Sequence, residues 1–134
     1  MNWHILAAIA VTGIVSTLTD FFFFGVLFND RYKKYPETWW PGVAEGKETR
    51  AIIMSSVLDF VTAAAVVVLC IYAGVRDIKG GLIVGALAAI AGPLVITVTN
   101  GFWIRIDPAI TFSQTAGYCL RFLIAGAAYA LIAT

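Results

Sequence analysis

Four long apolar runs constrain the fold of this chain more than any other feature of its sequence. A helix needs about 20 apolar residues to cross the hydrocarbon core of a bilayer. Residues 3–28, 51–74, 81–103 and 111–132 each reach that length. Because backbone groups in lipid must be satisfied within their own segment, such runs form helices rather than isolated strands. The sequence therefore predicts four membrane-spanning helices.

The composition agrees with a membrane protein. Of the 134 residues, 60% are hydrophobic and only 13% are charged, whereas ordinary soluble domains carry about 25% charge. A soluble chain this short could not bury so much apolar surface. We predict an all-α integral membrane protein whose residues 1–134 form one four-helix bundle.

The connections between the runs predict the topology. Residues 29–50 form a long polar loop, whereas residues 75–80 and 104–110 are short connections that make neighbouring helices antiparallel. Both termini should therefore lie on one side. Lysine and arginine favour cytoplasmic loops, and the first and third connections hold six of them against two in the second. This bias predicts a cytoplasmic 29–50 loop.

The 29–50 loop is rich in aromatic residues. It carries Tyr32, Tyr35, Trp39 and Trp40, with prolines at positions 36 and 41. Tyrosine and tryptophan prefer the headgroup region, so one interpretation is a segment that lies on the membrane surface. A lid over a cavity is the alternative, and the sequence does not decide between them.

Three charged residues, Asp20, Asp59 and Arg121, fall well inside the predicted spans. Each costs about 2.5–3.5 kcal/mol at the centre of a membrane helix, so such side chains usually face the bundle interior and pair. Counting about 1.5 Å per residue from the loop ends of the spans places all three roughly 12–15 Å deep. We predict one polar centre with Arg121 between the two carboxylates.

Two carboxylates and one guanidinium give this centre a formal charge of −1. A buried excess charge is unfavourable, so either one carboxyl takes up a proton or a cation binds. Proton-coupled carriers use this chemistry. The alternative is a static ion pair that only orients the helices.

Polar residues at helical spacing extend the predicted centre. The candidate substrate- or ion-binding residues are Asp20, Asp59, Thr97, Asn100, Tyr118 and Arg121. Pro93 predicts a kink in the third helix. The small residues Gly85, Gly92 and Gly126 predict close helix packing, within the bundle or at a dimer face.

The two halves of the chain contain short similar stretches. Residues 17–23 resemble 97–103, with Asp20 and Asn100 at equivalent positions. Residues 58–64 resemble 120–126, with Asp59 and Arg121 at equivalent positions. These matches suggest a parallel two-helix repeat about an axis along the membrane normal. Chance similarity between common membrane residues is the alternative.

Several other function classes lack support in the sequence. One histidine and two isolated cysteines form no zinc pattern, and no HExxH motif or nucleophile–base set is present. The net charge of +1 offers no basic footprint for nucleic acid. We therefore expect no cofactor, no metal site and no nucleic-acid partner, and an intramembrane enzyme is the least favoured function.

Short motifs in all four runs carry a family resemblance. They are Phe23–Phe28, Gly80–Gly85, Asn100–Phe102 and Ala116–Leu120. Through them the chain resembles the small bacterial membrane proteins known as domain of unknown function 1761. The resemblance implies four helices in the inner (cytoplasmic) membrane and no established activity. Asp20 and Arg121 depart from the family pattern, and because the family has no established activity the resemblance assigns no site residue.

Two functions remain favoured. The first is a small transporter or binding protein whose polar centre meets a solute or ion with proton coupling. A homodimer would be expected there, because four helices are few for a carrier. The second is an accessory or structural subunit that packs against a larger membrane complex, with the bilayer around both.

Overall fold

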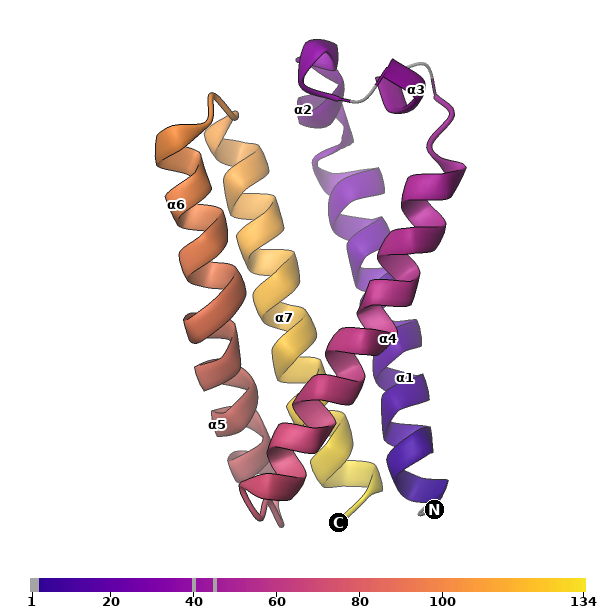
Figure 1. Cartoon of the computed structure of the whole chain (residues 1–134), viewed down its shortest axis with the longest axis vertical. Helices are drawn as coiled ribbons and strands as arrows, with labels where there is room; N and C mark the ends of the chain where they lie inside the picture. Colours follow the sequence, from indigo (N-terminus) through magenta and orange to yellow (C-terminus); the bar gives the residue numbers. More distant parts are fainter. Residues whose placement is uncertain (1–2, 40, 45) are drawn as a thin grey trace.

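The computed structural model describes residues 3–39, 41–44 and 46–134, and helices dominate it (Figure 1). In chain order they are α1 (Trp3–Asp20), the π-helical η1 (Phe21–Leu27), α2 (Asn29–Lys33), the 3-10 helix η2 (Pro36–Thr38), α3 (Pro41–Ala44), α4 (Thr49–Tyr72), α5 (Ile78–Ala89), the π-helical η3 (Ile90–Leu94), α6 (Val95–Trp103) and α7 (Pro108–Ile132).

Four continuous helical segments are long and apolar enough to cross a membrane. They are Trp3–Leu27, Thr49–Tyr72, Ile78–Trp103 and Pro108–Ile132. The third begins where the Asp77 side chain caps α5 by accepting from Gly80 N at 2.7 Å, and the fourth where Asp107 accepts from Ala109 N at 2.8 Å. The predicted four-helix membrane bundle is confirmed, and the chain is a multi-pass membrane protein.

The two termini lie at the same end of the bundle, and the α2–α3 loop lies at the opposite end (Figure 1). This agrees with the predicted topology. We call these the terminal end and the loop end. At the terminal end, small apolar side chains form the core, among them Ala8, Val66, Cys70 and Ala125, each fully buried.

Helix α7 packs against α1, α4, α5 and α6. Its contact with α5 is a backbone contact, because glycines face each other. A Cβ on Gly126 would lie 2.0 Å from the backbone oxygen of Gly81, and one on Gly85 would lie 2.5 Å from that of Phe122. Gly85 and Gly126 thus pack within the bundle. A Cβ on Gly92 would meet nothing within 4 Å.

Two π-helical segments interrupt the long helices. Segment η3 contains Pro93, which lacks the N–H that an α-helical hydrogen bond needs. The sequence placed an irregularity at this residue. Segment η1 follows Asp20 directly and contains no proline, so it was not predictable from the sequence. Such segments occur frequently at functional sites.

Candidate functional site

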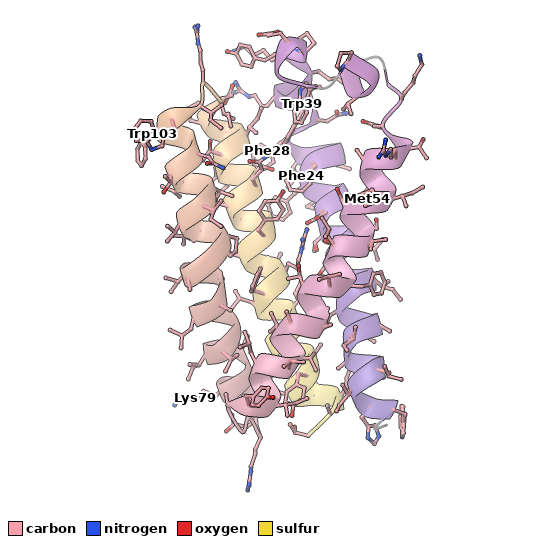
Figure 2. The ribbon with its side chains drawn as sticks, viewed as in Figure 1. Phe24, Phe28, Trp39, Met54, Lys79 and Trp103 are labelled. Carbon is pink, nitrogen blue, oxygen red and sulfur yellow. The ribbon has the colours of Figure 1, made fainter. Side chains whose placement is uncertain are left out.

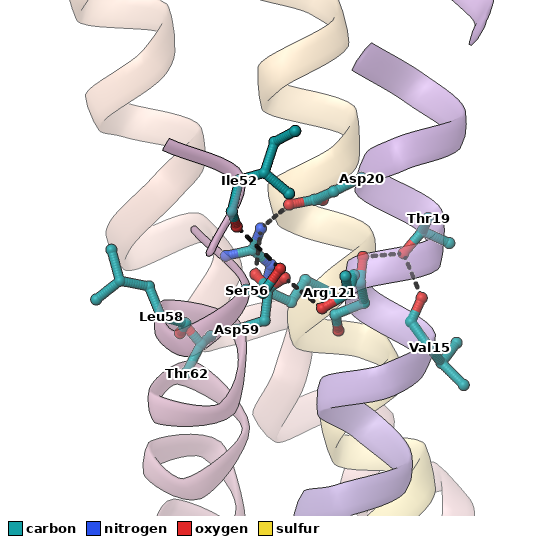
Figure 3. A network of polar contacts seen from close by, with 11 residues as sticks. Val15, Thr19, Asp20, Ile52, Ser56, Leu58, Asp59, Thr62 and Arg121 are labelled. Atoms are coloured by element: carbon teal, nitrogen blue, oxygen red, sulfur yellow. Dashed lines mark hydrogen bonds and ion pairs between the residues drawn. The ribbon is translucent and has the colours of Figure 1, made fainter. Parts of the chain in front are cut away.

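Asp20, Asp59 and Arg121, which we call the triad, meet inside the bundle from α1, α4 and α7 (Figure 3). Nη2 of Arg121 forms an ion pair and hydrogen bond with Oδ2 of Asp20 and lies 2.7 Å from Oδ1 of Asp59. One guanidinium nitrogen therefore serves two carboxylates. The structure brings together the three charges that the depth count placed at one level, and their binding role stays a prediction.

The triad is nearly closed off from the surface of the chain. The side chains of Asp59, Arg121 and Asp20 are 1%, 9% and 13% exposed. Removing such charges from water costs several kcal/mol per ion, and their mutual attraction offsets this only when the remaining polar atoms are also bonded. Thr17 donates to Oδ2 of Asp59 at 2.9 Å. In the described part of the chain, Oδ1 of Asp20 and Nε of Arg121 have no hydrogen-bond partner.

Neighbouring residues on α7 position the triad. Gly117 lies directly beside the triad, since a Cβ there would be in ordinary contact with Cζ of Phe24 at 3.5 Å and Oδ1 of Asp20 at 3.9 Å. The ring of Tyr118 lies 5.1 Å from Cζ of Arg121, a cation–π contact that steadies the guanidinium. Tyr118 therefore joins the triad, as the sequence suggested.

Thr97 and Asn100 do not join it. Oγ1 of Thr97 lies 2.7 Å from Oγ1 of Thr115, six residues before Arg121 on α7, which is about 9 Å along the helix axis. Asn100 lies one turn further toward the loop end and is exposed. The structure thus places them nearer the loop end than Arg121, since α6 packs against the loop-end half of α7, and their binding role stays a prediction. The environments of Asp20 and Asn100, equivalent in the suggested repeat, therefore differ.

Aromatic rings connect the triad to the loop. Ring centroids lie 6.0 Å apart for Tyr118 and Phe24, 5.7 Å for Phe24 and Tyr32, and 5.4 Å for Tyr32 and Trp39. Nε1 of Trp39 donates to the Tyr32 carbonyl at 2.8 Å. Figure 2 shows Trp39 and Phe24 between α7 and the loop end of the α1 segment. Sequence reasoning missed Phe24, although it lies one turn after Asp20.

Two cavities of about 260 Å³ each lie at the loop end. The first, which we call the loop-end cavity, is lined by residues that include Tyr35, Trp39, Arg105, Asp107, Ile110 and Gln114. The second is lined by α6 and the start of α7, and the triad lines neither. Asp107 also pairs with Arg31 across 3.7 Å, which ties the loop to the 104–110 connection.

The loop-end cavity bears on the two interpretations of the 29–50 loop. Tyr35 and Trp39 line this partly open cavity together with the 104–110 connection, so this part of the loop lies against that connection. Trp40 lies outside the described residues. Among the residues that the structure describes, no group of three or more histidine, cysteine or acidic side chains could hold a metal ion.

Comparison with known families identifies the chain's relatives. The family described as protein of unknown function (DUF1761) matches residues 7–130. Comparisons with curated proteins and with solved structures found no match. The match covers nearly the whole chain, so this protein belongs to the DUF1761 family, as its motifs suggested.

Proposed function

We propose that this member of the DUF1761 family is a small membrane carrier or binding protein whose triad takes up and releases a proton as a small solute or ion binds. One observation carries the proposal: a single guanidinium nitrogen contacts two buried carboxylates that come from different helices. Charged groups inside membrane spans commonly mark proton relays and ion pathways.

The charge at the triad supports proton exchange. With both carboxyls ionised, the triad carries a net charge of −1. Of its three side chains, only that of Asp20 is more than a tenth exposed. Binding one proton would make the triad neutral and would remove the repulsion between the two carboxylates. A static helix-orienting pair needs only one carboxylate for one guanidinium, so the second acidic residue favours an exchangeable charge.

We also propose an orientation in the membrane and an oligomeric state. Six of the eight lysines and arginines in the three connections lie at the loop end, which favours a cytoplasmic loop. The inner membrane is proposed from the family resemblance. A homodimer is part of the proposal, because four helices are few for an alternating-access carrier built from repeats.

A pH-jump experiment tests the proposal. Purified protein in liposomes on a solid-supported membrane should give a transient current when the external pH falls, because protons enter the triad. Asp20→Asn and Asp59→Asn should each reduce this current strongly, whereas Asp30→Asn, at an exposed loop carboxyl, should leave it unchanged. Equal currents in all four proteins, or none in wild type, would contradict proton exchange at the triad.

One observation favours the alternative, an accessory subunit of a larger membrane complex. Neither loop-end cavity is lined by the triad. A carrier site needs a route for its solute, whereas an ion pair that only holds the helices together needs none. Extraction from native membranes in mild detergent separates the two. An accessory subunit should migrate with the mass of a larger assembly, whereas a chain that runs alone or as a dimer argues against that role.

A further inference from the structure

Ser113 differs from five other hydroxyl residues of the bundle. The hydroxyls of Thr19, Ser56, Thr62, Thr97 and Thr115 each donate to a carbonyl one turn earlier in their own helix. This is the usual arrangement in membrane helices. Ser113 is completely buried, yet its Oγ has no hydrogen-bond partner in the described part of the chain.

Thr12 and Ser16 on α1 share this property within the described residues, and the Tyr32 hydroxyl is a further such group. Its oxygen is buried and lacks a hydrogen-bond partner within the described ranges. Burial raises the pKa of Tyr32 to about 12, and the side chains of Ser113 and Gln114 oppose this rise. Tyr32, Ser113 and Gln114 therefore lie close together. The phenol and the Ser113 hydroxyl are thus near enough for a hydrogen bond that their present geometry does not complete, and a shared water or a small movement would connect them.

These groups lie between the loop-end cavity and the triad. Ile110 and Gln114 line the cavity, Ser113 follows within the same turn of α7, and Gly117 and Arg121 follow one and two turns later, at about 6 Å per four residues. Oδ1 of Asp20, buried and unpartnered in the described structure, faces the space beside Gly117. Along the axis of α7, Ser113 and Gln114 thus lie between the cavity and the triad.

The ring of Phe24 lies beside this stretch of α7. It contacts the rings of Tyr32 and Tyr118, and its Cζ is the atom that a Cβ on Gly117 would meet first. We propose that the loop-end cavity is the proton entrance to the triad, that the Tyr32 and Ser113 hydroxyls connect the two, and that Phe24 is the gate between them. This inference rests on the proposed proton exchange at the triad.

The path passes protons without changing the charge of either hydroxyl. A hydronium ion that enters the cavity gives a proton to Tyr32 or Ser113 and leaves as water, and the hydroxyl releases its own proton on the other side. Asp20 Oδ1 gains that proton when Phe24 moves aside. No oxidant, metal or other co-reactant takes part in the transfer.

Cysteine accessibility tests the entrance. In a background with Cys70→Ala and Cys119→Ala, Ser113→Cys should react with a charged, membrane-impermeant methanethiosulfonate reagent added at the loop side. The control is Ser55→Cys, at a similar depth in α4 but on an exposed face that lipid would cover. A thiol in hydrocarbon stays protonated and unreactive, so Ser113→Cys should react about tenfold faster or more.

Gly117→Cys tests the gate. Its thiol should react slowly in an otherwise unchanged background and about tenfold faster when combined with Phe24→Ala, because reagent and water then reach it. Phe22→Ala removes an exposed ring and should leave the rate unchanged. Circular dichroism and gel filtration confirm that each variant is folded.

The outcomes separate this inference from the proposed function. Equal reaction rates for folded Ser113→Cys and Ser55→Cys would overturn the entrance, even where the pH-jump currents still depend on Asp20. Fast labelling of Ser113→Cys supports the entrance whatever the pH-jump result. No acceleration of Gly117→Cys by Phe24→Ala would overturn the gate.

Discussion

Replacing Arg121 with methionine should destabilise the protein by about 3–5 kcal/mol, the usual cost of removing one partner from a buried ion pair. Both carboxylates contact one guanidinium nitrogen, so they lie within about 6 Å of each other, where two like charges repel by about 3 kcal/mol at an effective dielectric constant of about 20. Protonation of one carboxyl would relieve part of this repulsion, so the loss should be smaller at low pH.

Unfolding by sodium dodecyl sulfate in mixed micelles, followed by circular dichroism, measures the effect. A loss of about 3–5 kcal/mol corresponds to roughly a hundred- to several-thousand-fold in the folding equilibrium. Arg76→Met, at an exposed arginine in the short connection, should change stability by no more than about 0.5 kcal/mol.

Compensating substitutions complete the test. Adding Asp20→Asn and Asp59→Asn to Arg121→Met leaves no charge in the bundle interior and should restore much of the lost stability. The reasoning is refuted when Arg121→Met unfolds like wild type, or when the triple variant is no more stable than Arg121→Met alone.

Two further predictions concern packing and pH. Gly126→Ala should cost about 1–3 kcal/mol because its Cβ would overlap the Gly81 carbonyl and separate α5 from α7, whereas Gly92→Ala should cost almost nothing; equal costs in a detergent unfolding assay would contradict the close backbone contact. Burial raises the pKa of Tyr32 from 10.0 to about 12 in the folded state. Its contribution to stability should therefore be complete below pH 10.0 and fall as the pH rises toward about 12. Tyr32→Phe should remove that part of the alkaline loss, and an unchanged slope would contradict the burial of the phenol.

The sequence predicted those features that depend on position along a helix axis. Hydropathy predicted the four spans, and counting residues from their ends placed Asp20, Asp59 and Arg121 at one depth. The lengths of the connections predicted that both termini share one end. Each of these follows from the rise per residue and the thickness of the bilayer, which do not depend on how the helices pack sideways.

Features that depend on which helices are neighbours were not predictable in this way. Asn100 and Thr97 lie on a polar stripe, but the stripe does not say where α6 packs against α7. The contact between the Phe24 and Tyr32 rings depends on the π-helical η1, which contains no proline from which it could have been predicted. The loop-end cavity depends on how the aromatic loop folds back over the 104–110 connection.

Proton exchange at the triad requires that one of its two carboxyls carries an exchangeable proton. Infrared difference spectra of the protein in lipid, recorded over the pH range in which it stays folded, test this directly. We expect a protonated carboxyl band that is present in wild type and Asp30→Asn, titrates with pH, and is lost when Asp20 and Asp59 are both replaced by asparagine. Spectra in which the doubly substituted protein shows the same titrating band as wild type would contradict it.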